Sequence, residues 1–141
     1  MRIVLDTNIL VSALISGEGP PGQVLAAVKS PGITLVTSRF QIDELRDVLA
    51  RDRLQPYIRR EEAEDLLYHL EAVAVVVADL PEVSLSADPD DNPILATAIA
   101  GDADLIVSGD RGDMLAVGSV HGIPIVTARE AADRLRARKE D

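Results

Sequence analysis

Short apolar runs alternate along the chain with longer segments in which apolar residues recur at helical spacing. The runs are continuous, which is typical of strands buried on both faces of a parallel sheet. The predicted strands are Arg2–Leu5, Thr34–Thr37, Val73–Val77, Leu105–Ser108 and Gly122–Val126. The predicted helices are Asn8–Ser16, Gln23–Lys29, a segment capped by Ser38, Arg60–Leu70, Pro93–Ala100 and a segment capped by Thr127. This order predicts an α/β fold, with a central parallel β-sheet covered by helices on both faces.

Length and composition favour one globular domain and narrow the classes of partner. The 141 residues, 47% of them apolar, predict a single domain over residues 1–141. A net charge of -10 argues against a protein that holds nucleic acid mainly through a basic surface. With no Cys and two His, a thiolate or zinc site is not expected. The longest apolar run, Ala72–Ala78, is far too short to span a bilayer, so we expect a cytoplasmic protein without a membrane partner.

Three acidic residues follow or precede predicted elements at positions that bring them to one edge of the sheet. Asp6 ends the first strand, and Asp110 follows the strand Leu105–Ser108. Asp91 comes just before the Pro93 helix, in a loop that could reach the same edge. Open parallel sheets bind their ligands at the carboxyl ends of their strands. Each of these three acids taken alone has an ordinary alternative as a turn or helix-capping residue. That these acids and a fourth one, Glu44, all lack a functional role at one edge is much less expected.

Glu44 is the fourth acid of this set, and it lies on a helix. At roughly 100° per residue, it falls inside the apolar arc of that helix. The arc is formed by Phe40, Ile42, Leu45, Val48 and Leu49. An acid that faces inward must be paired, protonated or bound to a cation. Pairing with an arginine is the alternative to a functional role.

Acidic residues are concentrated in the second half of the chain. Between Asp79 and Asp113 there are nine acids and a single base, Arg111. Crowded carboxylates raise one another's pKa unless a cation neutralises them. Hard oxygen ligands without Cys or His suit Mg²⁺ or Mn²⁺, and we expect about two such ions. Such a site can support phosphodiester cleavage, and it lets an acidic protein bind a polyanion.

Four segments of the chain, in order, resemble motifs of the PIN-domain family of metal-dependent nucleases. The first is Val4-Leu5-Asp6-Thr7-Asn8, and the second runs from Ser38 to Leu45 and contains Glu44. The third is Asp91-Asn92-Pro93-Ile94-Leu95-Ala96-Thr97-Ala98, and the fourth is Leu105–Asp110 with Asp113 just after it. The resemblance covers nearly the whole chain. It implies a PIN-like three-layer α/β/α sandwich with a central parallel β-sheet.

The resemblance also implies a set of site residues. The metal-binding and catalytic carboxylates would be Asp6, Glu44, Asp91 and Asp110, and the secondary site residues would be Asn8, Ser108 and Asp113. Two alternatives stay open: Asp88 or Asp90 could replace Asp91, and Asp113 could share or take over the role of Asp110.

The function implied by the resemblance is metal-dependent endoribonuclease activity. Within the family, the chain looks most like the toxin of a bacterial toxin–antitoxin pair, with RNA as substrate, a cognate antitoxin as partner and a homodimer as assembly. The alternatives are a nuclease of RNA processing without an antitoxin, and a non-catalytic module of the same fold that acts in binding. An arginine-rich region could hold RNA or an acidic partner, or pair with nearby acids: Arg39, Arg46, Arg51, Arg53, Arg59 and Arg60.

Overall fold

The computed structural model describes residues 1–109 and 113–140, and in this part of the chain strands and helices alternate as the apolar pattern predicts. The strands are β1 (Arg2–Leu5), β2 (Thr34–Ser38), β3 (Val75–Val77), β4 (Leu105–Ser108), β5 (Ser119–Val120) and β6 (Ile123–Thr127). The α-helices are α1 (Thr7–Ile15), α2 (Pro20–Val28), α3 (Arg39–Leu49), α4 (Arg60–Ala72), α5 (Asn92–Ala100), α6 (Asp113–Val117) and α7 (Ala128–Glu140). Two 3₁₀ helices span Asp52–Tyr57 and Pro89–Asp91.

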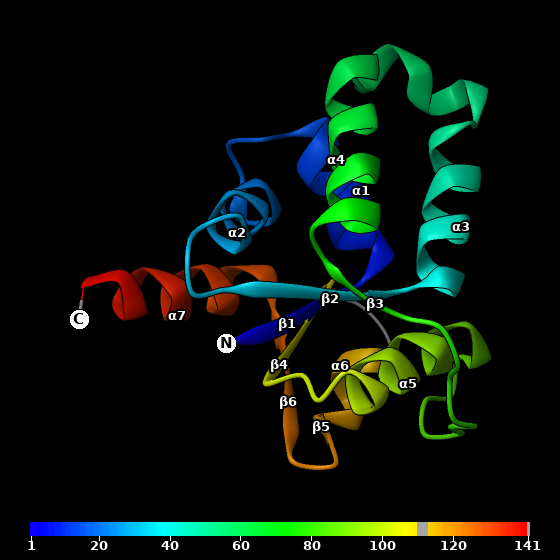
Figure 1. Ribbon diagram of the computed structural model, residues 1–141, viewed down its shortest axis with the longest axis vertical. Helices are drawn as coiled ribbons and strands as arrows, with labels where there is room; N and C mark the ends of the chain where they lie inside the picture. Colours follow the sequence, from blue (N-terminus) through cyan, green and yellow to red (C-terminus); the bar gives the residue numbers. More distant parts are fainter. Residues whose placement is uncertain (110–112, 141) are drawn as a thin grey trace.

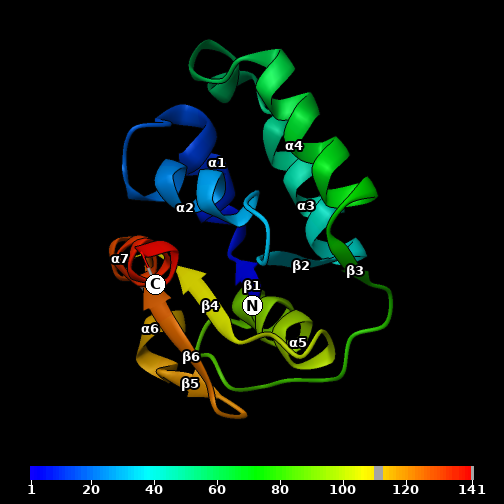
Figure 2. The same cartoon turned by 60° about the vertical axis from the view of Figure 1, so that its left-hand side comes forward.

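The strands form one mostly parallel sheet in the order β3-β2-β1-β4-β6-β5. Only the short edge strand β5 is antiparallel, to β6. Helices α1, α2, α3, α4 and α7 lie on one side of the sheet, and α5 and α6 lie on the other (Figures 1 and 2). The expected α/β fold with helices on both faces of a parallel sheet is therefore confirmed, and β5, α6 and the two 3₁₀ helices are additions to it.

Each central strand contributes side chains to two separate apolar layers, because successive residues of a strand point to opposite faces. In β1, Ile3 and Leu5 belong to the layer beneath α1, α2 and α7, whereas Val4 packs with Leu95 of α5 on the other side. Continuous apolar strands are required for this arrangement. Burial of both faces fixes the register of β1, so the position of the residue that follows it is fixed as well.

Helix α3 begins as its sequence predicts but turns a different face inward. The Ser38 hydroxyl accepts a hydrogen bond from the Gln41 amide, so Ser38 is the expected N-cap. We expected Phe40 within the buried arc, and this is wrong: Phe40 is 47% exposed, whereas Gln41 is 1% exposed. The buried face is centred on Ile42 and Leu45, and at roughly 100° per residue Phe40 lies almost opposite that centre.

A smaller difference concerns the start of β3. Strand β3 begins at Val75 rather than Val73, because α4 continues to Ala72 and the Val73 amide still bonds to the His69 carbonyl. Within residues 1–109 and 113–140, no helix has the length and apolar character that crossing a bilayer requires.

Candidate metal and nuclease site

The candidate site lies where the strand order of the sheet reverses. From β1 the chain builds β2 and β3 on one side, and then β4 and β6 on the other. In open α/β sheets this switch point leaves a crevice at the carboxyl ends of the two central strands, and ligands bind there. Asp6 directly follows β1 and Ser108 ends β4, and the Asp6 amide donates to the Val107 carbonyl at 2.9 Å.

Asp6 is a half-buried carboxylate held by its neighbour on β4. The Ser108 hydroxyl donates a hydrogen bond to Asp6 Oδ2 at 3.0 Å. Asp6 occupies the N-cap position of α1, and the backbone amide of Asn8, in the first turn of that helix, also interacts with its carboxylate. Because Asp6 also accepts the hydrogen bond from Ser108 of β4, helix capping is not the only contact of its carboxylate.

The surroundings of Asp6 disfavour its charged form. Burial raises the pKa of Asp6 above its ordinary value, and hydrogen bonds from the Ser108 hydroxyl and the Asn8 backbone amide oppose this rise. The negative charges of Asp91 and Glu44 raise the pKa of Asp6 further. Three acids from three separate elements are thus close enough to interact electrostatically.

Glu44 is half-buried on α3 and faces the start of α1. The buried Thr7 hydroxyl donates to Glu44 Oε1 at 2.5 Å. Thr7 immediately follows Asp6, so the same short stretch of backbone fixes both carboxylates. Glu44 forms no ion pair with any residue in the described ranges, so arginine pairing, the alternative for an inward acid, is not found there.

A buried chain of polar groups links the elements that carry the acids. Gln41 Nε2 donates to the Leu5 carbonyl at 2.6 Å and lies 3.5 Å from Thr7 Oγ1. Gln41 Oε1 accepts from the Thr37 hydroxyl at 2.6 Å. All three side chains are buried, so every one of these bonds is shielded from water. This buried chain of polar groups joins β1, β2, α1 and α3 directly behind Asp6 and Glu44.

The buried chain of polar groups extends to α5. Thr97 Oγ1 lies 2.9 Å from Ser38 Oγ and 2.7 Å from the Pro93 carbonyl oxygen. Thr97 is completely buried, and it ties the start of α5 to the carboxyl end of β2. Sequence reasoning missed Gln41, Thr37 and Thr97 as supporting residues, and the signal available was a set of polar residues inside otherwise apolar segments.

Asp91 is the half-buried acid of its loop, and Asp88 and Asp90 are exposed. The Ser86 hydroxyl donates to Asp91 Oδ2 at 2.9 Å, while Asp88 caps the 3₁₀ helix by accepting from the Asp90 amide at 3.0 Å. Burial raises the pKa of Asp91, the bond from Ser86 opposes the rise, and the charges of Asp88, Asp113 and Asp90 add to it. This geometry favours Asp91 over its two neighbours.

The remaining expected site residues are Asn8, Ser108, Asp110 and Asp113. Asn8 and Asp113 are exposed, at the second residue of α1 and the first of α6. Ser108, also expected as a secondary site residue, is buried and bonded to Asp6. Asp110, expected as the fourth carboxylate, lies outside the described residues.

The three described acids do not form a closed ligand cage. Over residues 1–109 and 113–140, no group of three or more acidic or histidine side chains stands close enough to hold a metal ion. Asp6, Glu44 and Asp91 instead each accept a hydrogen bond from a separate hydroxyl group, on Ser108, Thr7 and Ser86 respectively.

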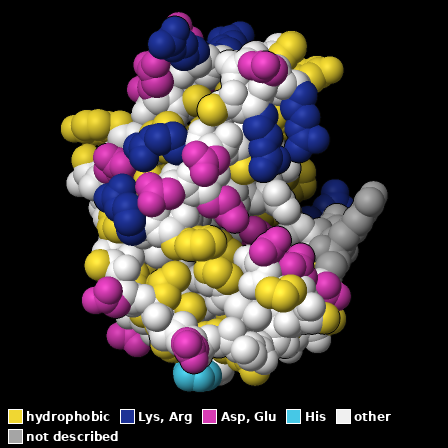
Figure 3. Space-filling model, turned by 90° about the vertical axis from the view of Figure 1, so that its right-hand side faces the viewer, with side chains coloured by type: hydrophobic (Ala, Val, Ile, Leu, Met, Phe, Trp, Pro, Cys, Tyr) yellow, Lys and Arg dark blue, Asp and Glu magenta, His cyan; other side chains and the backbone are white. Residues whose placement is uncertain are grey.

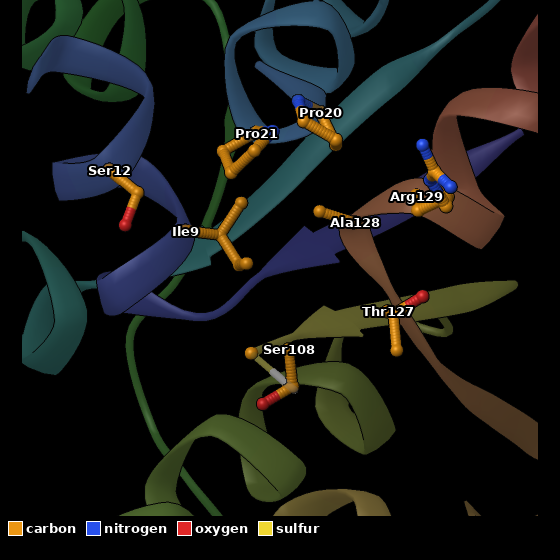
Figure 4. Close-up of a pocket in the computed structure, with 9 residues that line it drawn as sticks. Ile9, Ser12, Pro20, Pro21, Ser108, Thr127, Ala128 and Arg129 are labelled. Carbon is orange, nitrogen blue, oxygen red and sulfur yellow. The ribbon is translucent and has the colours of Figure 1, made fainter. Parts of the chain in front are cut away.

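A pocket of about 580 Å³ adjoins Asp6 on the β4 side (Figure 4). Ser108, which bonds to Asp6, lines it, and Pro20 and Pro21 of α2 lie across from Ser108. Thr127 and Arg129, at the end of β6 and the start of α7, close one side. The lining of this pocket therefore includes one cationic side chain, that of Arg129.

Half of the expected arginine-rich region is engaged with nearby acids. Arg46 and Arg39 contact Glu71 at 2.9 and 3.1 Å, and their hydrogen bonds lower the pKa of Glu71. Arg60 pairs with Glu64 at 3.1 Å. These three arginines support the interpretation of the region as a solvated set of ion pairs.

The sheet order and the acids at its switch point define the class of protein: a parallel α/β protein with an acidic site at the carboxyl ends of its strands. The family model described as "PIN domain" matches residues 2–112, and the chain belongs to the PIN-domain family, whose members are generally nucleases. The chain is also similar to a protein of Methanocaldococcus jannaschii described as "Uncharacterized protein MJ1680". The two are 28% identical over 138 residues, which cover 92% of this chain and 88% of that protein.

Proposed function

We propose that the chain is a divalent-metal-dependent endoribonuclease that hydrolyses RNA phosphodiester bonds. The observation that carries the proposal is the half-buried Asp6 carboxylate at the switch point of the sheet, whose pKa is raised by burial and further by the negative charges of Asp91 and Glu44. Nearby negative charges destabilise the ionised form of a half-buried carboxylate such as Asp6. A cation bound by Asp6, Glu44 and Asp91 would neutralise these negative charges, so the arrangement is suited to binding a divalent metal.

The donor chemistry fits Mg²⁺ or Mn²⁺. All three side chains offer only carboxylate oxygens, and none is ion-paired with a residue in the described parts of the chain. Asp6, Glu44 and Asp91 would hold the metal, together with Asp110 as the sequence predicts. When bound, the metal supplies positive charge that neutralises phosphate oxygens and lowers the pKa of water.

The chain's own residues orient the reaction. Ser108 holds Asp6 Oδ2, so Asp6 keeps a fixed position at the end of β1. Thr7 engages Glu44 Oε1, which leaves Oε2 to accept a hydrogen bond from the attacking water. Arg129, across the adjoining pocket, binds a phosphate of the same RNA strand. Water rather than the ribose 2′-hydroxyl is the nucleophile, so the products carry 5′-phosphate and 3′-hydroxyl ends.

The cleavage assay that tests the proposal uses purified protein, Mn²⁺ and a mixed RNA pool. Asp6→Asn keeps the shape of the side chain and removes its charge, and should lower the rate at least about 100-fold. Asp65→Asn is the matched control, because Asp65 is an exposed acid on α4, remote from the sheet edge. Cleavage that survives EDTA, or 2′,3′-cyclic phosphate ends, would contradict the proposal.

Within this function we assign the role of a toxin restrained by a cognate antitoxin, on the strength of the resemblance described above. The competing role is RNA processing without an antitoxin. Induced expression in a bacterial host separates them: growth arrest by the wild-type chain, absent with Asp6→Asn, is the result expected of a toxin. Unimpaired growth at equal expression, with cleavage retained in vitro, would assign RNA processing instead.

A further inference from the structure

Phe40 is the only phenylalanine in the chain, and it is 47% exposed in the first turn of α3. Aromatic rings are usually among the side chains that contribute most to a core. The apolar layers of this protein are aliphatic, and the inward position next to Phe40 is occupied by Gln41. The ring is thus left at the surface by the same helix rotation that places Gln41 behind the site.

The position of Phe40 relative to the acids is specific. Phe40 comes one turn before Glu44, and side chains four apart on a helix are neighbours, with Cβ atoms about 5–6 Å apart. Both residues line one groove of about 340 Å³ along α3. Phe40 also lines an adjoining hollow of about 360 Å³ with Asn92 and Pro93, the two residues that follow Asp91.

Phe40 therefore separates two hollows, each of which contains or borders a site acid. On the face that carries α3 and α5, Figure 3 shows an apolar patch bordered by acidic side chains. Apolar members of this patch, besides Phe40, include Leu80, Val83 and Pro93. A ligand that approaches Glu44 or Asp91 across this face meets the Phe40 ring next to the acids.

We propose that Phe40 stacks on a nucleobase of the RNA strand, next to the bond that is cleaved. This inference rests on the proposed function, which places the scissile phosphate beside Glu44. A base is attached to the ribose on each side of that phosphate, so a neighbouring base lies within reach of a ring one helical turn away.

The charge of the protein favours this form of recognition. With a net charge of -10, the surface gains little from attraction to the RNA backbone. Stacking on an aromatic face does not depend on a cationic surface, and every base presents such a face. A single well-placed ring beside the acids thus supplies affinity where charge cannot.

Kinetics separates stacking from a general apolar contact. Phe40→Ala should raise KM for RNA about 5- to 150-fold with kcat little changed, the range known for loss of one base–aromatic stack. Phe40→Tyr, which keeps an aromatic face, should retain most of the affinity. Phe40→Leu, which keeps apolar volume without a π-face, should behave like Phe40→Ala. Full retention of KM by Phe40→Leu would overturn the stacking role.

A spectroscopic test follows from the absence of tryptophan in the chain. Phe40→Trp introduces a single indole at the proposed stacking position, and Tyr68→Trp introduces one on α4, at a residue that is 72% exposed. Each variant is titrated with a single-stranded RNA hexamer in Ca²⁺, which replaces Mg²⁺ to slow cleavage. An abasic sugar-phosphate strand of equal length is the second probe, and anisotropy of a labelled strand reports binding independently.

Saturable quenching of the Phe40→Trp indole by the RNA hexamer is the expected result, with weaker quenching by the abasic strand and none in the Tyr68→Trp variant. Bound RNA without quenching at position 40, or equal quenching at both positions, overturns the inference while leaving the nuclease proposal intact. Quenching that depends on protein concentration instead would assign the ring to a protein interface. If the wild-type chain does not cleave RNA under any metal condition, the proposed function fails first.

Discussion

Replacing Gln41 by methionine tests whether the buried polar chain behind the acids stabilises the fold and positions the site. Methionine has a similar shape but neither donates nor accepts the bonds that Gln41 makes. The Leu5 carbonyl would lose its 2.6 Å partner, and the Thr37 hydroxyl would lose its 2.6 Å acceptor. Both groups are buried, so water would not replace what is lost.

The size of the effect follows from these two bonds. Leaving a buried polar group without a partner costs about 1–3 kcal/mol, and the added apolar volume of methionine offsets part of that. We expect Gln41→Met to lower the free energy of unfolding by about 2–4 kcal/mol. Gln55→Met is the matched control, because exposed Gln55 also bonds to a backbone carbonyl, that of Leu49, and should lose less than about 0.5 kcal/mol.

Urea denaturation followed by circular dichroism measures both variants, and a double-mutant cycle isolates the Gln41–Thr37 interaction. Thr37→Val should cost less in the Gln41→Met background than in the wild type, because replacing both partners removes the unsatisfied group. The cleavage rate of Gln41→Met should also fall relative to Gln55→Met, since Leu5 precedes Asp6. Equal stability of the two variants, or strict additivity in the cycle, would refute the reasoning.

Three further predictions concern stability and pH. Gly22→Ala should lower the free energy of unfolding, measured by urea denaturation, by about 1–3 kcal/mol, because an added Cβ would stand 2.2 Å from the Gly17 carbonyl oxygen. Gly19→Ala is the control and should be tolerated, because the atom nearest to its added Cβ would be 3.8 Å away. The folded-state pKa of Asp6 is raised, so its contribution to stability without metal is greatest below the ordinary carboxyl pKa and is lost as pH rises through the raised value. Asp6→Asn should therefore be more stable than the wild type at neutral pH in EDTA, with the advantage fading in acid; an advantage that grows in acid would contradict the sign. Ser108→Ala removes the bond that holds the pKa of Asp6 down, so the acidic limb of the pH–rate profile should move to higher pH; an unshifted limb would mean that Ser108 does not act on Asp6.

The architecture could be predicted from the sequence because its signals are local. Continuous apolar runs such as Arg2–Leu5 indicate strands buried on both faces, and the Ser38 cap is confirmed by its bond to the Gln41 amide. Short elements were not predicted, since the two residues of β5 and the five of α6 carry too little pattern to be recognised.

The orientation of α3 shows what a local pattern does not contain. Counting apolar residues placed Phe40 inward, and the sequence assigned Gln41 only to the first turn after the Ser38 cap; in the structure Phe40 is exposed and the Gln41 side chain is buried. A glutamine can be buried only if partners meet all its polar atoms, and its partners here come from β1 and β2. Those partners exist only once the strands have paired, so the sequence of the helix alone could not indicate them.

The sequence indicates where the acids of the candidate site lie, but not which groups bond to them. Asp6 follows a strand whose register is fixed by burial, so its place at the sheet edge could be expected from the sequence. The hydroxyl partners of the acids, Ser108, Thr7 and Ser86, come from other elements, and their bonds depend on side-chain geometry. Of these, only Ser108 was expected as a site residue, and it was assigned no bond.

Calorimetric titration with Mn²⁺ tests most directly whether Asp6, Glu44 and Asp91 form a divalent-cation site. We expect saturable binding to the wild-type chain at millimolar Mn²⁺ or below, a rise in melting temperature with added metal, and the same behaviour in the Asp65→Asn control. Asp6→Asn should weaken the binding strongly, because it removes one of the negative charges that the cation neutralises. Absence of Mn²⁺ binding by the wild-type chain at millimolar concentration, or unchanged binding by Asp6→Asn, would contradict the account.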